Sequence, residues 1–284
     1  MADTLIIRLA PDQQGLIDWL LVDDQGQVKT PVQQGAPSAA IVASARRTVV
    51  LVPGTEVSLQ EARVPGRNRQ RVLRAIPFAL EEQLADDVDR LHFAPGASLG
   101  EDIYPVVVVE RERMDGWAAL LLEHGITADQ MVPDILAVPQ IEGWSLVPDE
   151  GRVLVRSGAY SGFACDTESL DALVALFAAR EQLPETARVF GGTVLDIEGV
   201  DVELDDSQLQ TLDVLARGWA QGPVIDLLQG AYSRREEWGR LVKPWKATAA
   251  LFLVCLVLAG TTTGINYYYL SQQQQQLGAE IEAL

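Results

Sequence analysis

The hydrophobic pattern of the first 222 residues switches repeatedly between the period of a strand and that of a helix. Short apolar runs bounded by turn residues are typical of strands, whereas apolar residues three and four positions apart are typical of helices. The pattern predicts strands at residues 4–10, 15–24, 46–54, 56–64, 103–110, 144–147, 152–156, 160–165 and 187–192, and residues 27–33 are a further candidate strand. It predicts helices at residues 68–85, 113–125, 167–181 and 207–222.

Individual residues add detail to three of these helices. The first contains Pro77, whose missing N–H and bulky ring predict a kink or a break. The third has Thr167 or Ser169 as its expected N-cap, and the fourth has Asp206 or Ser207.

The order of the elements indicates two lobes, residues 1–126 and 127–233, each with strands first and a helix after them. Strands and helices mixed in this way favour a duplicated α/β or α+β architecture. We therefore predict a mixed α/β fold class with two lobes.

A long apolar run follows the two lobes. The 19 residues from Ala247 to Ile265 carry no charge, and a helix of that length covers about 28 Å, close to the thickness of a bilayer core. A buried core helix would normally show one polar stripe, and the run has none. We predict a transmembrane helix at residues 247–267.

The flanks of this run predict its orientation. A basic juxtamembrane segment, residues 234–246, precedes it, and no Lys or Arg follows Lys246. Positive charge concentrates on the cytoplasmic side, and aromatic residues mark both interfaces. The start of the chain lacks the basic region of a signal peptide, which agrees with a cytoplasmic N-terminus. The expected membrane-edge residues are Arg240, Lys243, Trp245 and Lys246 inside and Tyr267 and Tyr268 outside.

The tail at residues 268–284 has a heptad-like pattern. Its apolar positions and Gln274 alternate at spacings of four and three, which predicts the start of a coiled coil. The glutamine run within it also fits a flexible linker.

Composition narrows the possible partners and chemistry. The formal net charge of −18 is repelled by phosphate backbones and argues against nucleic acid as a partner. The two cysteines, Cys165 and Cys255, cannot make a disulfide framework, which fits a reducing compartment.

The chain carries no recognisable catalytic, cofactor-binding or metal-binding signature. No phosphate-binding loop, dinucleotide-binding fingerprint or nucleophile elbow is present. The carboxylates between Glu81 and Asp89 are interpreted as a solvated helix face and its exit turn, and His92 as a structural residue among apolar neighbours. We expect no enzyme activity, no cofactor and no metal.

One basic stretch stands out against the acidic background. Arg67, Arg71 and Arg74 would share one helix face, so they are candidates for docking an acidic partner surface. A phosphate or lipid-headgroup site, pairing with the following acidic cluster, and simple solvation remain alternatives.

Two phrases carry a resemblance to a known family. RAIPFALEEQLADDVDRLHFAPG (Arg74–Gly96) and DLLQGAYSRREEWGRLVKPWK (Asp226–Lys246) resemble the L component of the type II (general) secretion system. The resemblance covers the whole chain in order. It implies a Gram-negative inner membrane and an actin-like, ribonuclease H-like cytoplasmic region, with the C-terminus in the periplasm. Family members usually carry a further external domain, so the resemblance also implies a chain that is truncated before it.

The resemblance implies a non-enzymatic scaffold. Such a protein recruits the cytoplasmic secretion ATPase to the membrane platform, links it to the M component, and supports export of folded proteins across the outer membrane. It also implies contacts with a pseudopilin and the inner-membrane F component, and assembly as a homodimer or higher oligomer.

Two alternative functions stay open. One is a membrane-tethered actin-like ATPase, but the hairpin turn that would hold phosphates contains Pro11 and only one glycine, Gly15. The other is a type IV pilus assembly platform, in which the actin-like and membrane parts are usually separate chains.

Overall fold

The computed structural model divides the chain into two compact units, Met1–Gln229 and Gly230–Leu284. Of the second unit it describes residues 230–233, which include one 3₁₀ turn, η6 (Gly230–Tyr232). The described residues are 3–11, 15–23, 26–66, 69–180, 183–192, 195, 197–205, 207 and 209–233.

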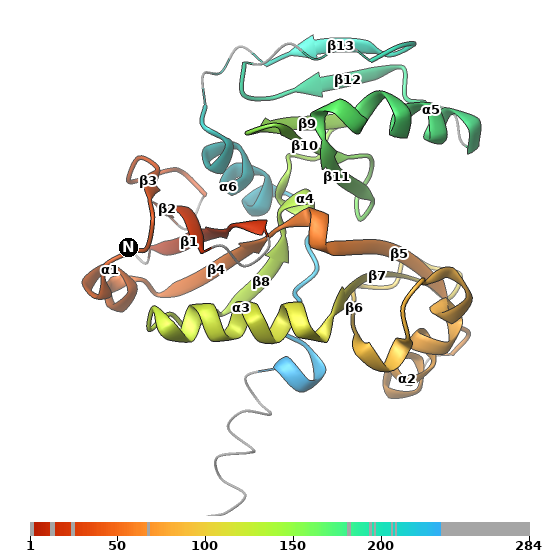
Figure 1. Cartoon of the computed structure of the whole chain (residues 1–284), viewed down its shortest axis with the longest axis horizontal. Coiled ribbons are helices and arrows are strands. Elements are labelled where there is room, and N and C mark those ends of the chain that lie inside the picture. Colours follow the sequence, from red (N-terminus) through yellow and green to blue (C-terminus); the bar gives the residue numbers. More distant parts are fainter. Residues whose placement is uncertain are drawn as a thin grey trace, which may run out of the picture. The chain divides into compact units, whose positions relative to one another are not determined.

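Two five-stranded sheets in the first unit share one topology (Figure 1). Their orders are β3-β2-β1-β4-β8 and β11-β10-β9-β12-β13. In each sheet the first strand in sequence pairs with the second, and the second with the third, and both pairs are antiparallel. The fourth strand pairs with the first and the fifth with the fourth, and both of these pairs are parallel. The first sheet contains β1 (Thr4–Leu9), β2 (Leu16–Val22), β3 (Gln33–Gln34), β4 (Arg47–Val52) and β8 (Gln130–Pro133). The second contains β9 (Trp144–Asp149), β10 (Arg152–Arg156), β11 (Gly162–Asp166), β12 (Thr186–Val189) and β13 (Asp201–Leu204).

A third sheet is inserted between β4 and β8 of the first sheet. Its three strands are antiparallel in the order β5-β7-β6. They are β5 (Val57–Arg63), β6 (Leu91–Pro95) and β7 (Ile103–Glu110). The helices are α1 (Ala39–Ser44), α2 (Arg69–Leu80), α3 (Arg111–Glu123), α4 (Asp134–Ala137), α5 (Leu170–Arg180) and α6 (Thr211–Gln221). Short 3₁₀ turns are η2 (Gly54–Glu56), η3 (Glu81–Gln83), η4 (Val88–Arg90) and η5 (Thr167–Ser169).

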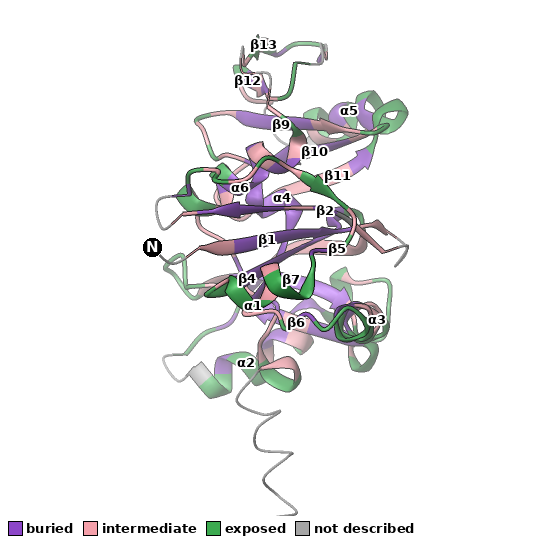
Figure 2. Ribbon diagram, turned by 90° about the vertical axis from the view of Figure 1, so that its left-hand side faces the viewer, coloured by how far each residue is buried: buried purple, intermediate pink, exposed green. Residues whose placement is uncertain are grey.

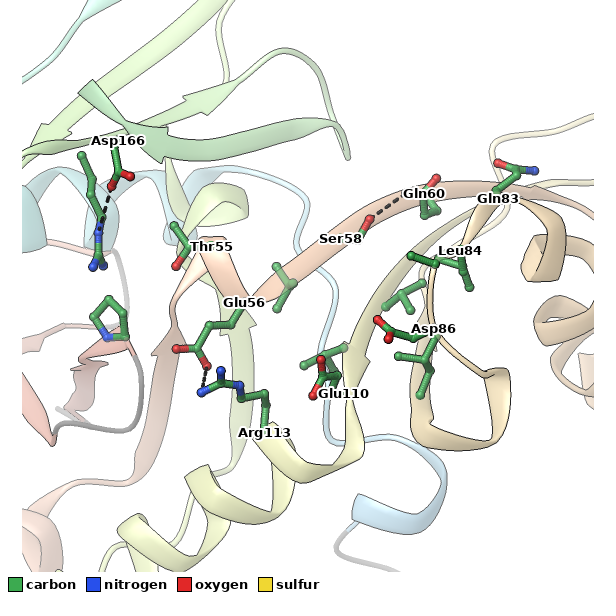
Figure 3. A pocket seen from close by; sticks show the side chains of 17 residues that line it. Thr55, Glu56, Ser58, Gln60, Gln83, Leu84, Asp86, Glu110, Arg113 and Asp166 are labelled. Atoms are coloured by element: carbon green, nitrogen blue, oxygen red, sulfur yellow. Dashed lines mark hydrogen bonds and ion pairs between the residues drawn. The ribbon is translucent and has the colours of Figure 1, made fainter. Parts of the chain in front are cut away.

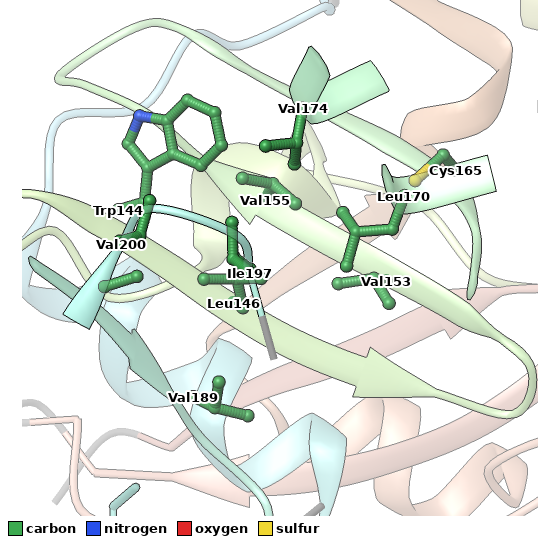
Figure 4. Close-up of a cluster of buried hydrophobic side chains, with 11 residues drawn as sticks. Trp144, Leu146, Val153, Val155, Cys165, Leu170, Val174, Val189, Ile197 and Val200 are labelled. Carbon is green, nitrogen blue, oxygen red and sulfur yellow. The ribbon is translucent and has the colours of Figure 1, made fainter. Parts of the chain in front are cut away.

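Each sheet has its own packed core. In the first sheet the continuous apolar strands β1 and β4 are buried, as expected for central strands with both faces covered (Figure 2). In the second, β10 residues Val153 and Val155 face Leu170 and Val174 on α5 (Figure 4). In the inserted sheet, the apolar stripe of α2 packs on one face: Val72, Ile76 and Leu80 contact Val106 and Val108.

Three aromatic side chains extend the core of the second sheet. The ring of Trp144 lies edge-on to Phe177 at 5.7 Å, and Phe163 stacks on Phe177 at 4.9 Å. Such pairs stabilise a core beyond the apolar area that they bury.

The helices differ from prediction mainly at their ends. The helix with Pro77 neither breaks nor ends there; it continues to Leu80, because Ile76 and Leu80 are held against the inserted sheet. The third helix becomes α5 after a separate 3₁₀ turn. The fourth begins at Thr211 rather than at residue 207, and its N-cap, Gln210, makes no side-chain cap hydrogen bond.

The first sheet extends past the expected lobe boundary at residue 126/127. Strand β8 lies beyond that boundary, yet it pairs with β4, and the second sheet begins only at Trp144. The strands β6, β8 and β13 and the short helices α1 and α4 were not predicted.

No helix in the described part of the chain is long and apolar enough to cross a membrane. The predicted span at 247–267, the membrane-edge residues and the coiled coil all lie outside the described residues.

Arg156 joins several segments of the first unit. Its buried guanidinium donates to five carbonyl oxygens, at 2.6–3.1 Å, and burial lowers its pKa to about 10, so it stays charged at neutral pH. The acceptors are Leu136, Val138, Gly158, Ala159 and Pro223.

Replacing Arg156 by Met should therefore destabilise the protein strongly, because five acceptors lose their donor. We expect a loss of about 3 kcal/mol or more, or about 6–12 °C in Tm, measured by scanning fluorimetry. Arg156→Lys should be intermediate, since lysine has only three donors. The half-exposed Arg152→Lys is the control and should change stability by less than about 1 kcal/mol. An Arg156→Met variant as stable as Arg152→Lys would contradict this role.

Candidate functional site

An ion cluster lies between the two five-stranded sheets. Arg8 on β1 is buried, and its guanidinium pairs with Asp18 on β2 at 3.0 Å and with Asp149 on β9 at 2.9 Å. Arg8 and Asp18 are cross-strand partners, so their side chains lie on the same face of the sheet. Because Asp149 belongs to the second sheet, the cluster ties the two five-stranded sheets together.

Charge keeps Arg8 ionised in the interior. Burial acts to lower the pKa of Arg8, but the charges of Asp18 and Asp149 outweigh it, and the pKa lies above its usual value. Removing either carboxylate would leave part of a buried charge uncompensated, which is far more costly than losing an exposed pair.

Asp134 is a fourth member of this cluster. Burial raises its pKa to about 7, against the opposing effects of Arg8 and the backbone amide of Gly54. Gly54 must approach closely: a Cβ there would lie 2.6 Å from Oδ1 of Asp134 and 2.3 Å from a carbon of Ile135. The carboxyl group is therefore held in a tightly packed site, where burial favours its protonated form.

The cavity beside the cluster is small, and it shares Pro11, Thr55 and Arg152 with a much larger groove. The cavity lined by Arg8, Pro11, Gly54, Asp134 and Asp149 has a volume of about 20 Å³. Pockets for cofactor-sized ligands are typically about 300–1,000 Å³. Among the described residues, no group of three or more His, Cys, Asp or Glu is placed to hold a metal ion. The cluster joins the two five-stranded sheets.

A much larger groove, about 600 Å³ in volume, lies nearby (Figure 3). One side is the inserted sheet with the loop after α2, and the other carries residues from η2, α3 and the second sheet. Glu56 pairs with Arg113 at 3.6 Å, and Arg152 with Asp166 at 3.9 Å. Its lining is Pro11, Thr55–Ser58, Gln60, Gln83–Asp86, Leu91, Val108–Glu110, Arg113, Arg152 and Asp166.

The last residues of the first unit form a strap, Pro223–Gln229, across two sheets. Asp226 accepts hydrogen bonds from the amides of Met131 and Leu228, both at 3.0 Å. The amide of Leu227 donates to the carbonyl of Met131 on β8, and its own carbonyl accepts from Nε2 of His92 on β6 at 2.8 Å. The strap therefore fastens the first sheet to the inserted one.

His92 is the structural residue that its apolar setting predicts. Burial lowers the pKa of its imidazole, and the carbonyl of Leu227 requires a proton on Nε2. The neutral ring with that tautomer satisfies both conditions.

The model of the type II secretion system protein L family matches residues 5–235, most of the chain. The chain belongs to this family. A relative in Pectobacterium carotovorum subsp. carotovorum is 30% identical over 279 residues, covering 95% of this chain and 65% of the relative. A family member in Vibrio cholerae is 25% identical over 300 residues, covering the whole chain and 69% of that protein.

The family's fold has a solved example. The cytoplasmic domain of EpsL, an inner membrane component of the type II secretion system of Vibrio cholerae, matches 82% of this chain and all of that structure. The TM-score is 0.68 at 22% sequence identity, a likeness that shows the fold.

The arginines predicted for docking lie away from the groove. Arg71 and Arg74 are exposed on α2, close in sequence to the exposed Phe78, and neither lines the groove; Arg67 lies outside the described residues. Sequence reasoning missed the groove because its lining comes from six separated segments. It also missed Arg8, whose position inside an apolar strand was a usable signal of a buried ion pair.

The raised pKa of Asp134 predicts a pH-dependent effect of Asp134→Asn. Between about pH 4 and pH 7 the folded protein keeps a proton that the unfolded chain releases, so this group destabilises the fold as the pH rises. The variant should match the wild type near pH 4 and exceed its stability at pH 8 by up to about 4 kcal/mol. Thermal unfolding across this range measures the difference.

The exposed Asp171→Asn is the matched control for the lost carboxylate, and it should not show the gain in stability at pH 8 that is expected of Asp134→Asn. An Asp134→Asn variant destabilised equally at both ends of the range would show that Asp134 is ionised in the fold.

Proposed function

We propose that this chain is a non-enzymatic inner-membrane scaffold of the type II secretion system that recruits the cytoplasmic secretion ATPase to the membrane platform. The observation that supports this most directly is family membership over residues 5–235. The Vibrio cholerae EpsL named above is an inner membrane component with a cytoplasmic domain, and we propose the same location for this chain.

We propose that the two five-stranded sheets are the lobes of an actin-like, ribonuclease H-like region. Both have the order 3-2-1-4-5 when their strands are numbered from the first of each sheet, with the same parallel and antiparallel pairs. The pairing of β8 supports a lobe boundary after α4 rather than at residue 126.

The proposal of a scaffold rather than an ATPase is supported by the filled cleft. Arg8 and its carboxylate partners fill the contact between the two sheets, and the cavity beside them has a volume of about 20 Å³. Holding another protein requires a complementary surface instead of a tuned catalytic group.

The membrane part completes the proposal. Residues 234–246 would lie at the cytoplasmic face, residues 247–267 would span, and residues 268–284 would begin a periplasmic coiled coil. Through these parts we propose pairing with the M component, contacts with a pseudopilin and the F component, and a homodimer or higher oligomer.

The central proposal predicts that the full chain in liposomes recruits the purified secretion ATPase of its own organism. We expect the ATPase to float with liposomes that contain the chain and to stay in solution with empty ones. The chain alone should release no phosphate from magnesium-ATP. Turnover by the chain alone, or no flotation of the ATPase, would contradict the scaffold proposal.

Charge reversal on α2 should weaken this recruitment. If Arg67, Arg71 and Arg74 dock an acidic surface, replacing all three by Glu should lower ATPase affinity about tenfold and reduce its salt dependence. The exposed residues Arg46, Arg90 and Arg217, changed to Glu together, make the control with the same change in net charge. Equal affinity and salt dependence in the two variants would refute the docking role.

A further inference from the structure

The 600 Å³ groove combines an apolar floor with a polar rim. Leu91 and Val108 are buried in its floor, and Leu84 and Val57 are half-buried beside them. Leu91 and Val108 belong to the core that α2 covers, so the apolar surface open to the groove comes from the half-buried Leu84 and Val57.

The charges in the groove do not cancel. Its two arginines are already paired, Arg113 with Glu56 and Arg152 with Asp166. Two carboxylates remain, those of Asp86 and Glu110, and neither side chain has an ion pair or hydrogen bond among the residues that the structure describes. Figure 3 shows both of them beside the space between β5 and the loop after α2. The groove therefore has a surplus of negative charge above an apolar floor.

The backbone beside the groove suits an extended chain. Strand β5 is an edge strand, paired only with β7 in the described part of the chain. Its residues Val57, Ser58 and Gln60 line the groove, so an extended occupant can lie along this strand. The rim adds the hydroxyl of Thr55 and the amide of Gln83, which can bond a peptide backbone.

We propose that this groove binds an extended, basic segment of a protein partner. A Lys or Arg of that segment lies between Asp86 and Glu110, and its apolar neighbours lie on Leu84 and Val57. The occupant touches residues of the inserted sheet, of α3 and of the second sheet at once, so it bridges parts of the chain that are far apart in sequence. The inference is independent of which protein supplies the segment.

The test uses the full chain in nanodiscs as the probe of an array of random eight-residue peptides. We expect the bound peptides to be enriched in Lys or Arg flanked by Val, Leu or Ile. Asp86→Lys combined with Glu110→Lys should weaken binding of these peptides at least about tenfold, measured by fluorescence anisotropy of the best binders.

The matched control separates this site from the general acidity of the protein. Glu82→Lys combined with Glu112→Lys makes the same change in net charge at exposed positions outside the groove, and it should leave binding unchanged. Gln60→Trp keeps the charge and fills the groove, so it should also abolish binding. All three variants should keep the wild-type Tm, which shows that they fold.

Three results would overturn the proposal: bound peptides with no basic enrichment, equal loss of binding in the groove and control variants, or full binding by a folded Gln60→Trp protein. Flotation of the secretion ATPase is measured separately. Loss of peptide binding therefore does not decide the scaffold function, and failure of the scaffold function does not decide this site.

Discussion

The contact between the two five-stranded sheets depends on the buried positive charge of Arg8. Arg8 is held inside a strand of otherwise apolar residues by Asp18 from its own sheet and Asp149 from the other. Since an uncompensated charge in an interior is very unfavourable, the two sheets are constrained to stay together at this point.

The long, strongly patterned elements could be predicted from the sequence. Strands β1, β4 and β7 are continuous apolar runs, and they lie where the pattern placed them. Helix ends could not be predicted as well, because they depend on tertiary contacts. Tertiary contacts also act inside a helix, as at Pro77. Its ring disfavours a helix locally, but Ile76 and Leu80 pack on the inserted sheet and keep the helix intact.

The candidate sites were harder to predict, because their residues meet only after folding. Arg8 and Asp149 are 141 positions apart, and no local pattern connects them. The exposed arginines of α2 were visible as a basic cluster, whereas the groove has both signs of charge and no motif. Its surplus of negative charge becomes apparent only when the pairs made by Arg113 and Arg152 are known.

The strap Pro223–Gln229 has a mechanical consequence for a protein whose chain continues from it toward a predicted membrane anchor. Any pull on residue 230 and beyond reaches β8 through Asp226 and Leu227 and β6 through His92. The load is divided between the first sheet and the inserted sheet before it reaches the rest of the first unit. A force on the chain from the membrane side would therefore move the first sheet and the inserted sheet together.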